Sequence, residues 1–459
     1  MILCRNSAAT TEGGFSRAAN MISTNGDRRK NTETGEHETL QASIISKRDC
    51  NSMKFLHAAE IHLDSPLDGL MGRTDLPNDV VKHCTRRAFE AMINLAIEED
   101  VAFVIIAGDL YDGDWKDFST GLFFAAQMQR LGRPCFLLRG NHDAQSVITK
   151  GLYPFSNVRE FSSRTCQTIP MPDLGVALHG HSFPNRAVPE DLSVNYNQAV
   201  AGMLNIGVLH SSAEDKGEHE VYAPCSVASL VLKGYDYWAL GHIHARQVLH
   251  ERPWIVFPGN LQGRHARETG AKGCTLVTVE DRRIVSVEHR LVDVVRWASL
   301  TVDAAEVEIN GLIGRIEREV VRAVSEAEGR PVLARLTLTG ATDLHGALLT
   351  DTERLVAECQ SAAISISGAL WVEKVRVRTR LPQVGQADML ASLRSAFMEG
   401  LDEKAISDRL LTDLADLQRR LPVEVRKTLA LPSDLEGLQA MVDDAWAVAA
   451  HALAEVDRS

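Results

Sequence analysis

From residue 54 onward, apolar and polar residues follow regular periods. Residues 101–110 form an apolar run, which is typical of a strand covered on both faces of a sheet. Apolar residues on both sides of this run recur at helical spacing. The pattern predicts a strand, a helix, a strand, a helix and a strand over residues 54–63, 79–99, 101–110, 118–131 and 135–141. This order predicts a largely parallel start to a sheet, with right-handed crossovers.

Beyond residue 175 the apolar segments become shorter and more closely spaced. They predict strands that complete the sheet by more antiparallel pairing, at residues 176–180, 205–210, 237–242, 254–259 and 274–280. A second unit starts near Val292 and alternates strand and helix again, at residues 299–304, 306–327, 331–340, 351–361 and 370–380. Pro382 then interrupts the chain, and residues 386–459 have a helical pattern.

Residues 1–52 differ from the rest of the chain. They are rich in Ser, Thr, Asn, Gly and charged residues, and they show no sustained period of 2 or 3.6. They also lack the apolar segment of a secretory signal. We therefore expect a disordered leader, or a start assigned too early, with Met53 as the working first residue.

Composition limits the classes of protein that remain. The chain has 459 residues, enough for two or three domains, and a formal net charge of −12. This charge excludes a strongly basic nucleic-acid binder as a description of the whole chain. It does not exclude an enzyme that binds phosphate through metal ions.

The cysteines and the apolar segments bear on the compartment. The eight cysteines are scattered without a C-x-x-C pair, which argues against a disulfide scaffold and a zinc ribbon. No stretch of 18 apolar residues occurs, so no transmembrane helix is expected. We therefore expect a cytoplasmic protein without a membrane partner.

Polar residues follow five of the predicted strands. They are Glu60 and His62, Asp109 and Asp112, Asn141 and His142, His210, and His242 and His244. Because the carboxyl ends of strands in an open α/β sheet meet at one crevice, these side chains can converge. A mixture of carboxylate, amide and imidazole ligands suits Mn²⁺, Fe²⁺ or Zn²⁺ better than Ca²⁺. Two such ions about 3.5–4 Å apart need a bridging carboxylate and polarise a hydroxide for attack on phosphorus.

This ordered set of motifs resembles the signature of calcineurin-like metallophosphoesterases over roughly residues 54–290. The sequence segments HAAEIHLDSPL and PGNLQGRHARETGAKG are similar to segments of the YhaO-type branch of bacterial DNA repair exonucleases, which are relatives of SbcD. The resemblance implies an α/β fold, a four-layer α/β/β/α sandwich over residues 54–290. An α/β capping domain over 291–381 and a helical C-terminal extension over 382–459 would follow.

The resemblance also implies a role for each site residue. The first metal ion would be held by Glu60, His62, Asp109 and His244, and the second by Asp109, Asn141, His210 and His242. Asp109 would bridge the two ions. His142 would face the scissile phosphate, where it stabilises charge or protonates the leaving oxygen, and Asp112 would orient its imidazole.

Glu60 is the one departure from the family pattern, which has Asp there. Glutamate keeps the charge but adds a methylene, which lengthens the reach of the carboxylate by over ~1 Å. Since metal geometry depends on such small displacements, we expect a weaker first metal site or altered spacing.

Two groups of basic residues have alternative interpretations. Arg264, Arg267 and Lys272 follow a strand in a glycine-rich loop; they could contact phosphates that flank the scissile bond, or be a solvated basic loop. Four cations alternate along one strand face, which could be a solvated face or a stripe that tracks DNA: Lys374, Arg376, Arg378 and Arg380.

The resemblance implies a metal-dependent phosphodiesterase that acts on DNA, a repair exonuclease for which endonuclease activity is also conceivable. It further implies Mn²⁺ as the favoured cofactor and a coiled-coil ATPase resembling SbcC as a partner. A homodimer is a further alternative. Two other hypotheses about the function are kept. One is the same chemistry on a small phosphate ester, and the other is a catalytically weakened subunit that binds DNA ends, because of Glu60.

Overall fold

The computed structural model describes residues 52–65, 81–113, 117–144, 156–213, 222–382, 404–422 and 431–456, with a few single positions between them. Residues 51–459 form one compact unit, to which all of the described residues belong. Apart from Ser52, the predicted leader lies outside the described residues, as do residues 386–394 of the predicted helical extension.

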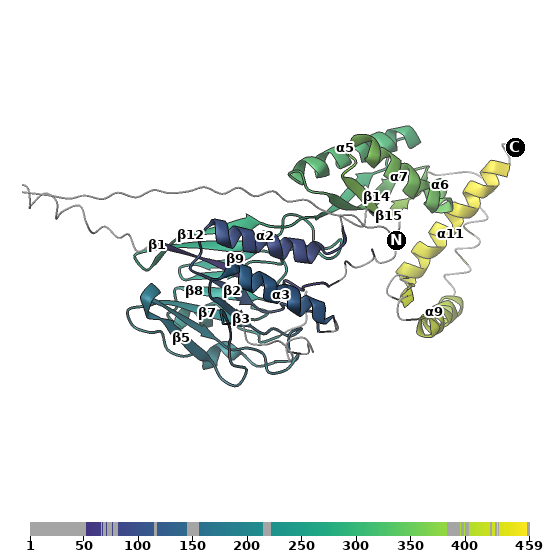
Figure 1. The fold of residues 1–459 in the computed structure, drawn as a ribbon. Helices are drawn as coiled ribbons and strands as arrows, with labels where there is room; N and C mark the ends of the chain where they lie inside the picture. The colour runs from purple at the N-terminus through teal and green to yellow at the C-terminus, as the bar shows by residue number, and fades with distance from the viewer. Residues whose placement is uncertain are drawn as a thin grey trace, which may run out of the picture. The chain divides into compact units, whose positions relative to one another are not determined.

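The first sheet has the strand order β12-β11-β1-β2-β3-β4 (Figure 1). Its strands are β1 (Ser52–Ala58), β2 (Phe103–Ala107), β3 (Cys135–Leu138), β4 (Val158–Glu160), β11 (Gly273–Glu280) and β12 (Arg283–Leu291). β1 to β4 pair in parallel, and the helices α2 (Cys84–Glu98) and α3 (Phe118–Leu131) connect the first three. This confirms the predicted parallel start. α2 begins later than the pattern suggested, after His83 in a left-handed conformation.

The second sheet has the order β5-β6-β7-β8-β10-β9. Its strands are β5 (Gln167–Met171), β6 (Val176–Gly180), β7 (Leu204–His210), β8 (Tyr237–Gly241), β9 (Gln247–Glu251) and β10 (Trp254–Phe257). The predicted change to more antiparallel pairing was wrong for the core of this sheet. β6, β7, β8 and β10 are parallel, because long connections return the chain to the same edge before each new strand, and only the outer pairs are antiparallel. The strand predicted at 274–280 joins the first sheet as β11.

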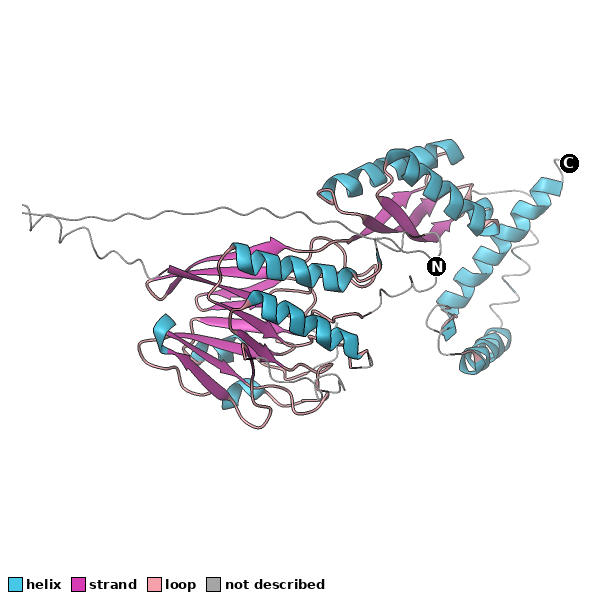
Figure 2. Cartoon of the chain, in the orientation of Figure 1, coloured by secondary structure: helices cyan, strands magenta, loops and turns pink. Residues whose placement is uncertain are grey.

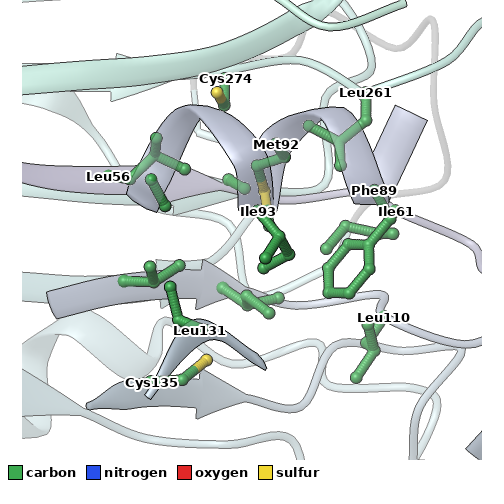
Figure 3. Packing of buried hydrophobic residues seen from close by; sticks show 14 of the residues in the cluster. Leu56, Ile61, Phe89, Met92, Ile93, Leu110, Leu131, Cys135, Leu261 and Cys274 are labelled. Atoms are coloured by element: carbon green, nitrogen blue, oxygen red, sulfur yellow. The ribbon is translucent and has the colours of Figure 1, made fainter. Parts of the chain in front are cut away.

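The two sheets pack face to face, and helices cover the outer face of the first. Along β1, Phe55 points toward the second sheet, whereas Leu56 points toward α2 and α3. Figure 3 shows Leu56 with Met92 and Ile93 of α2 and Leu131 of α3 in this outer core. The alternation follows from the two-residue period of a strand, which gives each face its own apolar set. Figure 2 shows the two helices over the first sheet.

The outer face of the second sheet carries a thinner layer of short elements. The helix α4 (Val227–Leu232) and the 3-10 helix η2 (Leu192–Asn195) cover it, together with loops. Trp238 of β8 is buried in this layer, and its indole donates a hydrogen bond to the Leu230 carbonyl at 3.1 Å. Residues 52–291 thus form the expected four-layer α/β/β/α sandwich.

A third, three-stranded parallel sheet follows, with the order β13-β14-β15. Its strands are β13 (Arg296–Asp303), β14 (Val332–Ala341) and β15 (Leu370–Arg380). The helices α5 (Ile309–Glu326) and α7 (Thr352–Ile366) connect the strands and bury one face of the sheet. Each predicted strand and helix of this unit is present within a few residues of its expected bounds.

Three helices follow or flank this sheet in the described part of the chain: α6 (His345–Thr350), α9 (Lys404–Arg420) and α11 (Leu435–Val456). His345 of α6 contacts both β15 and α11, with Nδ1 2.8 Å from Oγ1 of Thr379 and Nε2 3.3 Å from Oδ1 of Asp444. Among the described helices, none is both long enough and apolar enough to cross a membrane.

Candidate metal centre

The nine predicted metal and catalytic residues lie at the carboxyl ends of five strands. They directly follow or end β1, β2, β3, β7 and β8: Glu60 and His62, Asp109 and Asp112, Asn141 and His142, His210, and His242 and His244. Hydrogen bonds, ion-pair contacts of up to 4.0 Å and neighbouring rings join these residues into one cluster, as described below. The convergence expected from the sheet topology therefore occurs.

Four of these residues have a backbone conformation that L-amino acids rarely adopt. The φ angle is 53° at Glu60, 45° at His62, 53° at Asp109 and 105° at His242. Non-glycine residues in such regions cost about 1–3 kcal/mol each, and they persist where the surrounding structure fixes them. Strain of this kind clusters at functional sites, so its concentration here supports a functional role for the loops.

The surrounding structure fixes these loops through backbone hydrogen bonds and close packing. The amides of Glu60 and Ile61 donate to the carbonyls of Gly108 and Asp109 at 3.1 and 2.9 Å, which joins the loops after β1 and β2. A Cβ atom at Gly140 would lie only 2.3 Å from Oδ1 of Asp109. Glycine is therefore required at this position for the carboxylate to fit.

The Glu60 carboxylate lies between residues assigned to the two metal ions. Its Oε2 is 3.1 Å from Nε2 of His244 and 3.3 Å from Nε2 of His62, both assigned to the first ion. Its Oε1 accepts a hydrogen bond from the His242 amide at 2.6 Å and is 3.6 Å from Nδ1 of His210. Glu60 thus contacts residues of both assigned sets.

Asp109 also contacts the second set. Its Oδ2 is 3.6 Å from Nε2 of His210, and that nitrogen lies 2.9 Å from Oδ1 of Asn141. Its Oδ1 accepts a hydrogen bond from the backbone amide of His142 at 3.0 Å. The ring of His242 lies 5.2 Å from the ring of His210. Three of the four residues assigned to the second ion are therefore in direct contact, and the fourth has its ring beside them.

The donor set fits divalent cations. Three groups each bring potential ligand atoms within 4.8 Å of one another: Glu60 with His62 and His244, Glu60 with Asp109 and His210, and His62 with Asp112 and His142. Burial lowers the pKa of His62 to about 3 and that of His210 to about 4, so both imidazoles are neutral near pH 7 and can serve as ligands. Nδ1 of His62 is buried and has no hydrogen-bond partner among the described residues.

The buried carboxyl groups of the cluster would also be stabilised in their ionised form by positive charge. Asp109 and Asp143 are 1% exposed, and both lie near the buried carboxylate of Glu60. Burial raises the pKa of Asp109 well above its usual range, and the negative charges of Glu60 and Asp143 add to this effect. Bound cations would remove this penalty, since an opposite charge favours the ionised form of a carboxyl group.

His142 lies at the edge of the cluster, where its side chain is 33% exposed. Its Nδ1 is 2.8 Å from Oδ1 of Asp112. Oδ2 of Asp112 accepts hydrogen bonds from Ser65 at 2.8 Å and from Arg264 at 3.1 Å. Burial opposes the charge on Asp112, but the hydrogen bonds from His142 and Ser65 outweigh it and hold the pKa of this carboxyl well below its usual range. Asp112 is thus placed as the predicted orienting group requires.

Glu268 is a functional candidate that the sequence reasoning missed. Its Oε1 is hydrogen-bonded to Nδ1 of His244, and its Oε2 accepts from Nδ2 of Asn260 at 3.0 Å and from the Arg264 amide at 2.6 Å. Burial opposes protonation of His244, but Glu268 and Glu60 raise the pKa of this imidazole to about 9. A carboxylate behind a ligating histidine fixes its tautomer and ring orientation.

Asp143 is a second buried carboxylate without a predicted role. It accepts hydrogen bonds from the amides of Leu110, Tyr111 and Gly140, at 3.2, 2.9 and 3.2 Å. It therefore ties the loop after β3 to the loop after β2. The only sequence signal for it was its place directly after Asn141 and His142.

The three predicted phosphate-binding residues lie in different environments. Arg264 faces the centre, where Nη1 contacts Asp112. Arg267 is exposed to solvent. Lys272 is 8% exposed, and its ammonium group donates to the His244 carbonyl at 3.2 Å. In place of the expected contact with substrate, Lys272 supports the backbone of the loop that carries His244.

Comparison with known proteins agrees with this architecture. The family model for calcineurin-like phosphoesterases matches residues 53–246, and the model for the middle domain of metallophosphoesterase YhaO matches residues 297–380. A dimetal phosphatase from Danio rerio overlaps 52% of this chain and 99% of its own at 10% identity, but the TM-score of 0.31 is too low to carry an argument.

Two curated proteins share sequence over longer stretches. The chain is 26% identical over 204 residues to the DNA double-strand break repair protein Mre11 of Sulfurisphaera tokodaii, covering 42% of this chain and 50% of that protein. It is 34% identical over 298 residues to the uncharacterized metallophosphoesterase YhaO of Bacillus subtilis, covering 63% of this chain and 72% of that protein. With the matched family models, this identity shows that the chain belongs to the calcineurin-like metallophosphoesterase family.

Proposed function

We propose that this metallophosphoesterase hydrolyses phosphodiester bonds of DNA with the help of two divalent metal ions, Mn²⁺ being the favoured one. The observation that carries the proposal is the position of His142. It is partly exposed at the edge of a buried ligand cluster, and Asp112 holds it by a contact of 2.8 Å. The distant similarity to Mre11, a protein of DNA double-strand break repair, supports DNA as the substrate.

Seven side chains would hold the ions. They are Glu60, His62, Asp109, Asn141, His210, His242 and His244. Divalent ions in such a site polarise a water molecule for attack and neutralise charge on the phosphoryl oxygens. Glu60 and Asp109, which each contact the His210 imidazole in this structure, are the two carboxylates within reach of both sets.

His142 would act on the leaving group. With Nδ1 held by Asp112, its Nε2 is the nitrogen left to face a phosphodiester at the edge of the cluster. From there it can donate a hydrogen bond to the phosphoryl oxygen or a proton to the leaving oxygen. The contact with Asp112 fixes the orientation of the imidazole for this role.

Arg264 would keep the orienting carboxylate in place. Its Nη1 donates to both Asp112 and Ser65, at 3.1 and 2.9 Å, and its side chain is 16% exposed. Because its backbone amide also donates to Glu268, this one residue connects the His142 side of the centre with the His244 side. Arg267, which is exposed on the same loop, is the better candidate for a phosphate contact.

A cleavage assay tests the proposal. A short blunt-ended duplex labelled at one end is incubated with the full chain in Mn²⁺, and in parallel with a chelator. We expect metal-dependent shortening of the labelled strand, and a His142→Ala variant that binds the metal but does not cleave. Progressive shortening from an end would indicate an exonuclease, and internal cuts an endonuclease.

Two results would contradict the proposal. Hydrolysis of bis-p-nitrophenyl phosphate without any cleavage of DNA would replace DNA by a small phosphate ester. Binding of duplex DNA without hydrolysis of either substrate would favour a weakened end-binding subunit, with Glu60 as its cause.

We propose two kinds of assembly for this chain. A coiled-coil ATPase would follow from the SbcD-like resemblance, and a homodimer is the alternative assembly. Copurification of the tagged chain from its native source, together with its mass in solution, would distinguish these assemblies from a monomer.

A further inference from the structure

Four cations form a continuous row on one face of β15. Lys374, Arg376, Arg378 and Arg380 alternate along the strand and are all exposed. The residues between them point the other way, and Val375 and Val377 pack into the core under α5 and α7. We refer to the four cations as the basic stripe. It lies on the face of the third sheet that these helices do not cover.

The charges of the basic stripe are not neutralised within the described part of the protein. None of its four side chains makes a hydrogen bond or ion pair with a described residue. Other arginines of the same unit do: Arg335 pairs with Glu373 at 2.8 Å, and Arg354 with Glu358 at 2.7 Å. The basic stripe therefore presents a row of positive charge to solvent although the net charge of the chain is −12, and a polyanion would complement such a row.

The neighbouring strands leave this face flat and polar. Lys374 is in register with Arg335 and Ser299, Arg376 with Thr337 and Thr301, and Arg378 with Thr339 and Asp303. Of the two acidic residues near the row, Glu373 pairs with Arg335, and Asp303 accepts from the Ala305 amide at 3.0 Å. Short hydroxyl side chains and free cations are the groups that contact phosphate oxygens in nucleic-acid complexes.

Aromatic residues on this face are confined to its beginning. Trp371 and Trp297 pack into a core cluster with Ala266, which belongs to the loop that also carries Arg264. No exposed aromatic ring lies beside the basic stripe among the residues in the three registered rows. Single-stranded nucleic acids are usually held by stacking on such rings, so a duplex backbone fits this surface better.

We propose that the basic stripe is a docking surface for the phosphate backbone of duplex DNA. This inference rests on the proposed DNA substrate and adds a second contact outside the metal centre. Six residue steps from Lys374 to Arg380 span about 20 Å of strand, which corresponds to about six base pairs of duplex. The contact is independent of base sequence, because it is made to phosphates alone.

Salt dependence of binding tests this surface. The full chain is titrated with a labelled duplex in the presence of a chelator, over a fourfold range of salt concentration. The triple variant Lys374→Gln/Arg376→Gln/Arg378→Gln should reduce the slope of log Kd against log salt by about 2.7, since each phosphate contact contributes about 0.9. The affinity of the wild type would then fall about 40-fold more than that of the variant over this range.

A matched control removes three cations from the helical side of the same unit. Arg318, Arg322 and Arg354 are exposed on α5 and α7, and Arg318→Gln/Arg322→Gln/Arg354→Gln changes the charge by the same amount. We expect the slope of this control to equal that of the wild type. Equal slopes for all three proteins, or no duplex binding by the wild type at low salt, would overturn the proposal; in the second case an acidic protein would be the better partner.

A second readout keeps this proposal separate from the proposed nuclease activity. The triple variant should hydrolyse bis-p-nitrophenyl phosphate at the wild-type rate and melt at the wild-type temperature, which shows that the fold and the metal centre are intact. If the variant melts lower, the single variant Arg376→Gln replaces it, with an expected change in slope of about 0.9. A wild type that cleaves no DNA but shows the predicted salt dependence would refute the nuclease activity and leave this surface in place.

Discussion

The metal centre and the basic stripe are the two regions that we propose to contact phosphate, and their charges are arranged in opposite ways. At the metal centre the charged groups are buried acids, such as Glu60 and Asp109 at 1% exposure each, which repel phosphate until cations arrive. On β15 the charged groups are exposed cations that attract phosphate directly. The first arrangement is suited to catalysis, where positive charge must be placed close to the reacting atoms, and the second to holding a long polyanion loosely.

The two regions also differ in their backbone. The ligands of the metal centre lie in loops with positive φ angles at four positions, whereas the basic stripe lies on a regular strand paired along β14. A strained loop holds side chains in one geometry, and a regular strand repeats a charge at even spacing. Substitutions should therefore have large effects at the centre and small, additive effects on the stripe.

The largest effect is expected for Asp109→Asn. Removal of this shared carboxylate should abolish binding of both ions and lower the rate of hydrolysis about 10³-fold or more. Without metal, the variant should melt at or above the wild-type temperature, because a buried acid beside Glu60 and Asp143 is gone. Melting curves with chelator and with Mn²⁺ check this: Mn²⁺ should stabilise the wild type only. Two tightly bound ions in the variant would show that Asp109 is not the bridge.

His142→Ala should lower the rate of hydrolysis by about 10²- to 10⁴-fold, the usual contribution of a general acid or base. Its metal content should stay at the wild-type level, because His142 is outside the assigned ligand sets. Elemental analysis beside the cleavage assay checks both points. Loss of both ions would mean that the roles of ligand and proton donor are assigned wrongly.

Glu268→Gln should weaken the affinity for Mn²⁺ by about 10- to 100-fold, as is typical when a group behind a ligating histidine is lost. Glutamine keeps the shape but not the charge that raises the pKa of His244. The measurement is a calorimetric titration with Mn²⁺, with Glu288→Gln on the exposed part of β12 as a control. An affinity equal to that of the wild type would leave Glu268 a role in loop packing only.

Glu60→Asp should have the smallest effect at the centre, a loss of about tenfold in Mn²⁺ affinity, or about 1.4 kcal/mol. The shorter side chain cannot reach both the His242 amide and the imidazole of His244, which the glutamate contacts at 2.6 and 3.1 Å. A paired metal titration and nuclease assay gives the answer. A gain in affinity and kcat would instead support the expectation that the extra methylene misplaces the carboxylate.

Binding of duplex DNA in a chelator sharpens the contrast between the two regions. All four variants of the metal centre should bind the duplex with the same salt dependence as the wild type. If Asp109→Asn changed this slope, the buried centre and the basic stripe would not be separate phosphate sites.

The order of strands and polar turns made much of the molecule predictable. A buried strand ends where a polar motif begins, so Asp109 and Asn141 could be placed from the sequence at the ends of β2 and β3. The third sheet was predictable because its strands and helices alternate with clear periods. The parallel core of the second sheet was not, since an apolar run shows that a strand is buried but not which strand it pairs with.

Contacts between distant segments explain what else the sequence did not reveal. Glu268 lies 24 residues from His244 and follows no strand, so only the folded chain shows that the two side chains meet. Lys272 was expected either to contact phosphate or to lie in a solvated basic loop, but the fold buries it against the His244 carbonyl. Glu268 and Lys272 both belong to the loop whose sequence resembles that of YhaO. Polar residues of this loop support His244 and also Asp112, which holds His142.

The positive φ angles at Glu60, His62, Asp109 and His242 lie in the loops that also carry buried acids, so we expect these loops to open most readily before metal binds. Until then, strain and like charge act together on the same loops, and local opening there is easier than in the sheets. We expect a protease to cleave the metal-free protein faster than the metal-bound protein. The supply of divalent metal would therefore govern how long each molecule survives as well as how fast it works, and limited proteolysis with and without Mn²⁺ would measure this lifetime.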